Sequence, residues 1–119
     1  MSTLKVDTIQ DTNAVEMYLC KAWVNFDGTT ASINADGGVS SITDIAVGRY
    51  EVNFTNAFPD INYVCVTGIN HNSSSGGSNN YNRSAVSNPG TTSKAYYNTY
   101  GSNNSTLYDV PVCQLAVFR

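Results

Sequence analysis

Residues that could perform catalysis are few in this sequence, and they do not fall into a recognisable arrangement. His71 is the only histidine and stands in a run of asparagine and serine. The two glutamates are Glu16 and Glu51, and Glu51 falls on the polar side of an alternating stretch, where a carboxylate is ordinarily solvated. No GxSxG sequence marks a nucleophilic serine, and no pair of facing carboxylates is indicated. The sequence therefore predicts that the protein is not an enzyme.

The aspartates and cysteines fit structural roles better than a metal site. Most of the seven aspartates, such as Asp27, Asp36 and Asp60, occupy turn positions, where the side chain hydrogen-bonds nearby backbone. Cys65 and Cys113 lie in apolar runs, where a free cysteine behaves as a small buried hydrophobe. No Cys/His spacing typical of a metal site occurs. We therefore predict neither a metal nor a cofactor.

Composition argues against two kinds of partner. Charged residues make up 13% of the 119 residues, the net charge is −3, and the six basic residues are scattered singly. Nucleic-acid binding needs clustered Lys and Arg, so it is not expected. No run approaches the roughly 20 apolar residues of a membrane span, so no membrane insertion is predicted. The opening MSTLKVDTIQ lacks the apolar core of a secretory signal, and we expect assembly in a cytoplasm.

Two stretches alternate with a period of two residues, as half-buried strands do. In 49–54 (RYEVNF) the apolar face consists of Tyr50, Val52 and Phe54. In 22–27 (AWVNFD) the second face also carries a large side chain, Trp23, which suggests that this face is covered too.

The remaining segments complete an all-β pattern. Residues 63–69 and 111–118 are almost continuously apolar, as expected for central strands of a sandwich. The only helix-compatible window is 11–23, where Asp11 or Asn13 could cap a turn or two. Strands separated by turn residues every 10–15 positions predict a small antiparallel β-sandwich or jelly roll. We expect residues 1–20 to form an N-terminal arm and residues 21–119 a single β-sandwich domain.

Residues 70–109 have an unusual composition that points to recognition. They contain 26 Asn, Ser, Gly or Thr and five of the eight tyrosines. A linker would lack aromatics and would need a second domain to connect, whereas only an apolar segment follows. Tyrosine among small polar residues is typical of recognition loops, although tyrosines can equally well cover a sheet face. Residues 84–87 and 94–100 are candidate strands. The predicted receptor-contact residues are Asn79, Asn80, Tyr81, Tyr96, Tyr97, Asn98 and Tyr100.

Three ordered blocks resemble a known family. These are STLKVDTIQDT at 2–12, KAWVNFDGT at 21–29 and VSSITDIAVGRYEVNFTNAFPDINYV at 39–64, together with the ending CQLAVFR. They resemble small tail-fibre or receptor-binding structural proteins of tailed bacteriophages of the cyanophage type. The resemblance covers roughly the first 65 residues, and the variable part coincides with 70–109.

The resemblance implies a function that composition alone does not. It implies a β-sandwich module of the virion, a homotrimer in which exposed loops contact host cell-surface polysaccharide. The arm at TLKVDTIQ would attach the module to other virion proteins, since the chain has little room for a shaft. A capsid or neck decoration or adaptor protein with no host-binding role remains the alternative.

Overall fold

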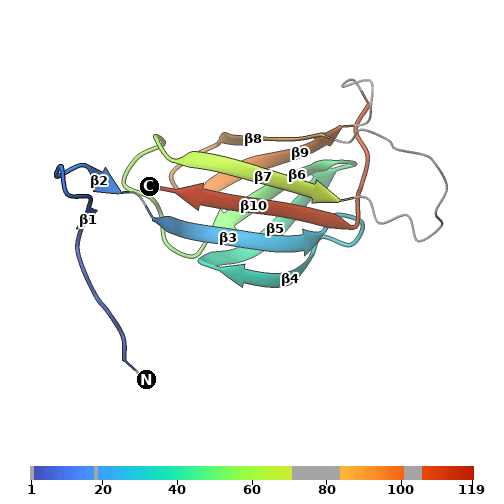
Figure 1. Ribbon diagram of the computed structural model, residues 1–119. Helices are drawn as coiled ribbons and strands as arrows, with labels where there is room; N and C mark the ends of the chain where they lie inside the picture. Colours follow the sequence, from blue (N-terminus) through green and yellow to red (C-terminus); the bar gives the residue numbers. More distant parts are fainter. Residues whose placement is uncertain (1, 18, 71–83, 101–105) are drawn as a thin grey trace.

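The protein is a sandwich of two antiparallel sheets, as the sequence predicts (Figure 1). The computed structural model describes residues 2–17, 19–70, 84–100 and 106–119. Within these residues every regular element is a strand, and no helix is long and apolar enough to cross a bilayer.

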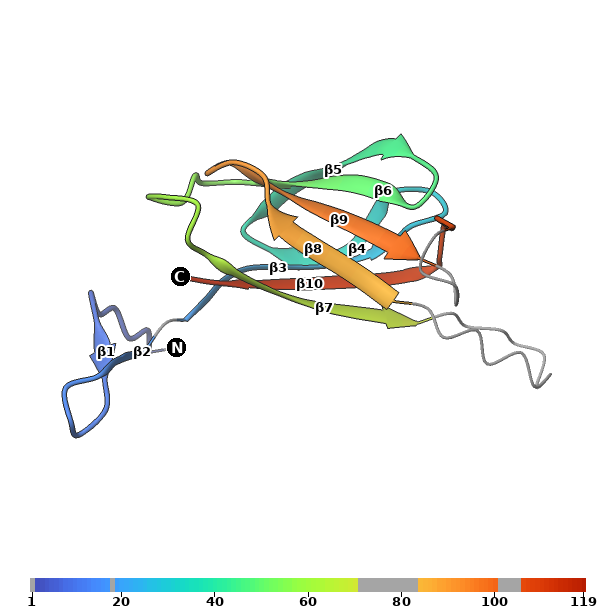
Figure 2. The ribbon, with the colours of Figure 1, turned by 90° about the horizontal axis from the view of Figure 1, so that it is seen from above.

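Each sheet of the sandwich has four strands, and Figure 2 shows the two sheets as separate layers. The first, called the β3–β10 sheet, has the spatial order β4 (Ser32–Gly37), β3 (Cys20–Asp27), β10 (Val112–Phe118) and β7 (Val64–Asn70). The second, called the β6–β9 sheet, has the order β5 (Val39–Ala46), β6 (Arg49–Phe54), β9 (Lys94–Tyr100) and β8 (Ser84–Pro89). The predicted strands at 49–54 and 94–100 have the bounds of β6 and β9, and the one at 84–87 extends to Pro89.

The core lies between the sheets and follows from the period-two alternation of side chains. In β6, Tyr50, Val52 and Phe54 all face inward and are buried, as the sequence predicts. The ring of Phe26 from β3 meets the Tyr50 ring edge-on at a centroid distance of 5.2 Å. Burying each such side chain contributes about 1.5–3 kcal/mol, so the alternation fixes which face of each strand is inside.

The prediction of two central strands is right for one and wrong for the other. Strand β10 lies between β3 and β7, and its alternate residues are buried. Strand β7 is an edge strand, and Val64 and Val66 on its outer side are 59% and 54% exposed. The continuous apolar run was a misleading signal, because the outward side chains Val64 and Val66 are apolar without being covered within one chain.

The helix-compatible window at 11–23 forms no helix in its described residues. It contributes instead to a short hairpin of β1 (Ile9–Gln10) and β2 (Glu16–Met17), which lies beside one end of the sandwich (Figures 1 and 2). Asp11 does cap a turn, but one that reverses a strand: its Oδ1 accepts from the Val15 N–H at 3.0 Å. The Asp11 N–H in turn donates to the Val15 carbonyl. This local pairing satisfies the backbone groups that a helix would otherwise use.

Candidate binding surface

Strand β9 carries four of the seven predicted receptor-contact residues, and its alternation divides them. Ala95, Tyr97 and Thr99 face the core and are buried. Tyr96, Asn98 and Tyr100 therefore share the outer face of the β6–β9 sheet, where each is partly exposed. Only these three of the four can meet a ligand on the sheet surface.

Tyr97 is a core residue, which corrects its prediction as a contact residue. Its side chain has no exposed surface, and its ring packs edge-on against Phe26 at a centroid distance of 5.3 Å. The hydroxyl donates to the Gly68 carbonyl of the opposite sheet at 2.7 Å, so it ties the two sheets together. Burial raises the pKa of the Tyr97 hydroxyl well above its ordinary value. The Tyr97 side chain therefore packs in the core and joins the two sheets, and it has no surface exposed to a receptor.

The outer surface around Tyr96, Asn98 and Tyr100 is called the tyrosine face. Across the β6–β9 pair, Glu51 lies opposite Tyr96 and Arg49 lies opposite Asn98. Lys94 Nζ is 2.9 Å from Glu51 Oε1 and 5.9 Å from the centre of the Tyr96 ring. The hydrogen bond to Glu51 is the main reason that the pKa of Lys94 is raised. The two charges beside Tyr96 thus neutralise each other.

Neighbouring polar side chains on the same sheet hold one another in place. Asn53 Nδ2 donates to Ser41 Oγ at 3.1 Å and to Thr43 Oγ1 at 2.9 Å across the β5–β6 pair. Amides, hydroxyls and tyrosine rings therefore occur at the strand spacing of about 4.8 Å, on a rigid sheet. Such a surface offers ring faces for stacking and hydrogen-bonding groups for hydroxyls, which suits an extended polar ligand.

The other three predicted contact residues, Asn79, Asn80 and Tyr81, lie outside the described residues. Their prediction is neither supported nor contradicted by the structure. The same holds for His71.

The outer side of the β3–β10 sheet carries exposed apolar side chains beside polar ones such as Asn25 and Gln114, and it is called the apolar face. Strand register places Trp23, Ala116 and Val66 in one row across β3, β10 and β7. Trp23 is 44% exposed, and its indole lies over Gly37 of β4, where a Cβ would overlap it. A shallow groove of about 530 Å³ runs along this row. The second face of β3, which the sequence suggested was covered, is open in the single chain.

Several carboxylates hold backbone in place, as expected for aspartates at turns. Asp109 Oδ1 accepts from the Gly48 N–H at 2.8 Å and lies 2.7 Å from the buried Tyr50 hydroxyl. Asp27 accepts a hydrogen bond from the Thr29 hydroxyl, and this bond is the main cause that lowers the pKa of Asp27. Among the described residues no three His, Cys, Asp or Glu side chains gather as metal ligands would.

The three cysteines are free thiols in different surroundings. Cys113 is buried, as predicted, and burial raises its pKa to about 12. Cys65 is half-buried, and burial raises its pKa as well. Cys20 is exposed at the start of β3. The two thiols in the apolar runs are thus protonated at neutral pH and act as apolar packing groups.

Sequence reasoning missed two surfaces that the fold assembles. One indication of the apolar face was visible in the sequence, because the apolar side chain Trp23 shares a face of β3 with the polar residues Asn25 and Asp27. A pocket formed by Lys21 with residues 56–59 had none, since its parts are far apart in the chain. Comparison of the chain with protein-family models, curated proteins and solved structures finds no match.

Proposed function

We propose that the protein is a non-enzymatic structural module of a tailed-phage virion, of the tail-fibre or receptor-binding type. In this proposal the tyrosine face contacts the surface polysaccharide of the host cell. The phage assignment rests on the resemblance of the three ordered blocks, and the binding role on the side chains that β9 presents. Three copies of the chain associate as a homotrimer. The N-terminal segment, residues 1–20, attaches the module to other virion proteins.

The observation that carries the binding role is the outward row on β9. Two tyrosine rings flank Asn98 on a sheet that is fixed from both sides by β6 and β8. Aromatic rings stack on the apolar faces of sugar rings, and an amide can donate to and accept from sugar hydroxyls. Because these side chains stand on a rigid strand, little conformational entropy is lost when they bind.

The alternative is a capsid or neck decoration or adaptor protein that binds no host cell. The apolar face favours contacts between virion subunits, since exposed apolar patches commonly mark protein interfaces. Both functions need this face covered, and they differ in whether the tyrosine face meets a sugar.

Adsorption of the purified protein to bacterial cells separates the two functions. The labelled parent protein is incubated with a panel of bacterial strains and with their extracted surface polysaccharides. Tyr96→Ala combined with Tyr100→Ala should abolish adsorption, whereas Tyr96→Phe, which keeps the ring, should retain most of it. Ile61→Ala removes an exposed loop side chain outside the tyrosine face, and it is the control for the loss of a large surface side chain.

Three outcomes are informative. Loss of adsorption in the double tyrosine variant, with normal melting, supports host binding through the tyrosine face. Unchanged adsorption in that variant removes the tyrosine face from the site. A parent protein that adsorbs to no strain but binds isolated virion parts favours the decoration role.

A further inference from the structure

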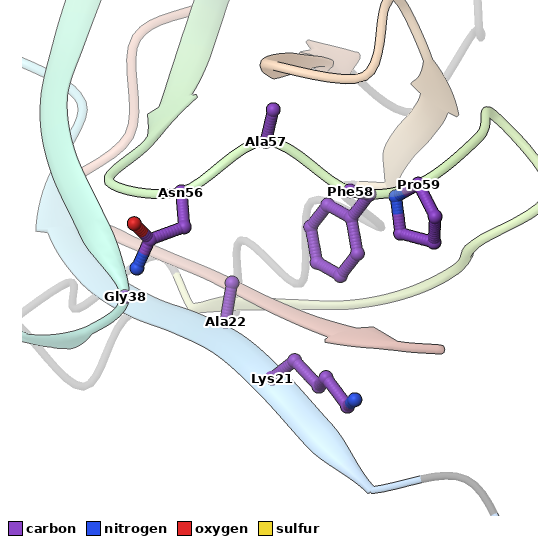
Figure 3. Close-up of a pocket in the computed structure, with 7 residues that line it drawn as sticks. All are labelled: Lys21, Ala22, Gly38, Asn56, Ala57, Phe58 and Pro59. Carbon is purple, nitrogen blue, oxygen red and sulfur yellow. The ribbon is translucent and has the colours of Figure 1, made fainter.

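A pocket of about 250 Å³ opens at the end of the sandwich from which β3 starts. Figure 3 shows its lining: Lys21 and Ala22 come from β3, and the loop after β6 contributes Asn56, Ala57, Phe58 and Pro59 above them. Gly38 closes one side, at the junction between β4 and β5. The volume lies just below the range of about 300–1,000 Å³ that holds drug-sized ligands, so it suits one sugar ring.

The frame of this pocket is fixed by backbone hydrogen bonds at both ends of the loop. The Thr55 N–H donates to the Gly38 carbonyl at 3.0 Å, and the Phe58 N–H donates to the Thr92 carbonyl at 2.8 Å. Gly38 has a φ of 72°, and a Cβ there would lie 2.7 Å from the Lys21 carbonyl. Only glycine therefore allows this close approach, and the pocket walls are set before any ligand arrives.

The apolar part of the pocket is equally well supported. The Phe58 ring packs edge-on against Phe54 at a centroid distance of 4.8 Å and lies 4.9 Å from the Tyr63 ring. The Tyr63 hydroxyl is itself bound to the carbonyls of Thr91 and Lys94. The wall formed by Phe58 and Pro59 is thus firmly held.

The polar side chains of the pocket have no partner among the described residues. Neither the Lys21 ammonium nor the Asn56 amide forms a hydrogen bond or ion pair there, and Lys21 is the only charged residue in the lining. Lys21 also borders a separate cavity of about 70 Å³ that is lined by Asp7 and Glu16, but it forms no salt bridge with either. A cation and a free amide thus stand beside an apolar wall.

We propose that this pocket binds a single acidic sugar, a hexuronate residue of a bacterial polysaccharide. The carboxylate meets the Lys21 ammonium in a charge-assisted hydrogen bond, which is the strongest polar contact that such a pocket can offer. The Asn56 amide hydrogen-bonds the ring hydroxyls, and the apolar ring face lies against Pro59 and the small exposed part of Phe58. The inference rests on the proposed function, because it names one component of the host glycan, and it adds a second site whose lining contains no residue of β9.

Titration of the full-length, isotope-labelled protein with methyl β-D-glucuronide tests the pocket by NMR. Backbone amides of Lys21, Gly38 and residues 56–58 should shift, with a dissociation constant on the order of millimolar, as is usual for so small a ligand. Methyl β-D-glucoside, which lacks the carboxylate, should bind at least about ten-fold more weakly. Added salt should weaken the glucuronide complex, because the contact is partly ionic.

Matched variants separate the pocket from general charge effects. Lys21→Gln should weaken glucuronide binding about ten-fold, and Ala57→Leu, at an exposed residue on the rim, should block it. Lys5→Gln makes the same charge change as Lys21→Gln at an exposed position outside the pocket, and it should leave binding unchanged.

Failure of this inference can be distinguished from failure of the proposed function. Shifts confined to other residues, equal binding of the neutral glucoside, or an unaffected Lys21→Gln variant would overturn the pocket assignment. Cell adsorption that persists in such a case leaves the tyrosine face as the host-binding site. Glucuronide binding at the pocket without adsorption to any cell supports the pocket and counts against host attachment.

Discussion

Replacement of the two adjacent tyrosines of β9 should have opposite consequences. Tyr97 has no exposed surface, whereas Tyr96 stands outside on the tyrosine face. Truncating a fully buried aromatic side chain costs about 3–5 kcal/mol, because transfer energy and packing are both lost. For Tyr97→Ala this is a large share of the roughly 6–18 kcal/mol expected for a chain of this length. Tyr96→Ala should change stability by no more than about 0.5 kcal/mol.

Thermal and urea unfolding of the purified variants measure these differences. The Tyr97→Ala loss corresponds to a melting temperature lower by about 10–25 °C, and Tyr96→Ala should shift it by only a few degrees. Tyr97→Phe keeps the ring and loses only the hydroxyl that donates to the Gly68 carbonyl, so it should cost about 1 kcal/mol. The inside–outside division of β9 is refuted if Tyr96→Ala destabilises the protein as much as Tyr97→Ala.

Three further outcomes are expected. Gly38→Ala should destabilise the protein by about 1–3 kcal/mol in urea melts, because alanine is strained at a φ of 72° and would press on β3; equal stability would contradict the tight junction. The hydrogen bond from Arg119 is the main cause that lowers the pKa of Asp60, so this carboxylate stabilises the fold above its unfolded pKa of about 4, and the contribution is lost as pH falls through the folded value. Asp60→Asn should accordingly be less stable than the parent at pH 7 and equal to it at pH 2. The proposed homotrimer of 12.8 kDa chains should have a mass of about 38 kDa by light scattering, and Trp23→Glu should convert it into monomers; an unchanged mass would exclude the apolar face from the subunit contact.

Strand alternation made a large part of the fold predictable. Tyr50, Val52 and Phe54 alternate with polar residues, and burial of one strand face against a second layer removes all three from water. Strand β5 was not predicted, because it is an edge strand that buries Val39 and half-buries Ile42, and its remaining residues are exposed. A strand with so little buried surface is held mainly by its hydrogen bonds to β6, which leave no trace in hydrophobic periodicity.

The candidate site was predicted less completely than the fold. The composition of 70–109 pointed to tyrosine and asparagine as contact residues, but it could not assign the two faces of β9. The same period-two rule that was applied to β6 would have placed Tyr97 inside, opposite Tyr96. The apolar face and the Lys21 pocket depend on register between distant strands, which tertiary contacts determine.

The most direct test of the account is to map where host polysaccharide touches the protein. Amide signals of the isotope-labelled protein are followed during titration with surface polysaccharide from an adsorbing strain. We predict that the signals of Tyr96, Asn98 and Tyr100 respond while those of Trp23 and Val66 on the opposite face do not. A response confined to the apolar face, with the outer row of β9 unaffected, would contradict the proposal.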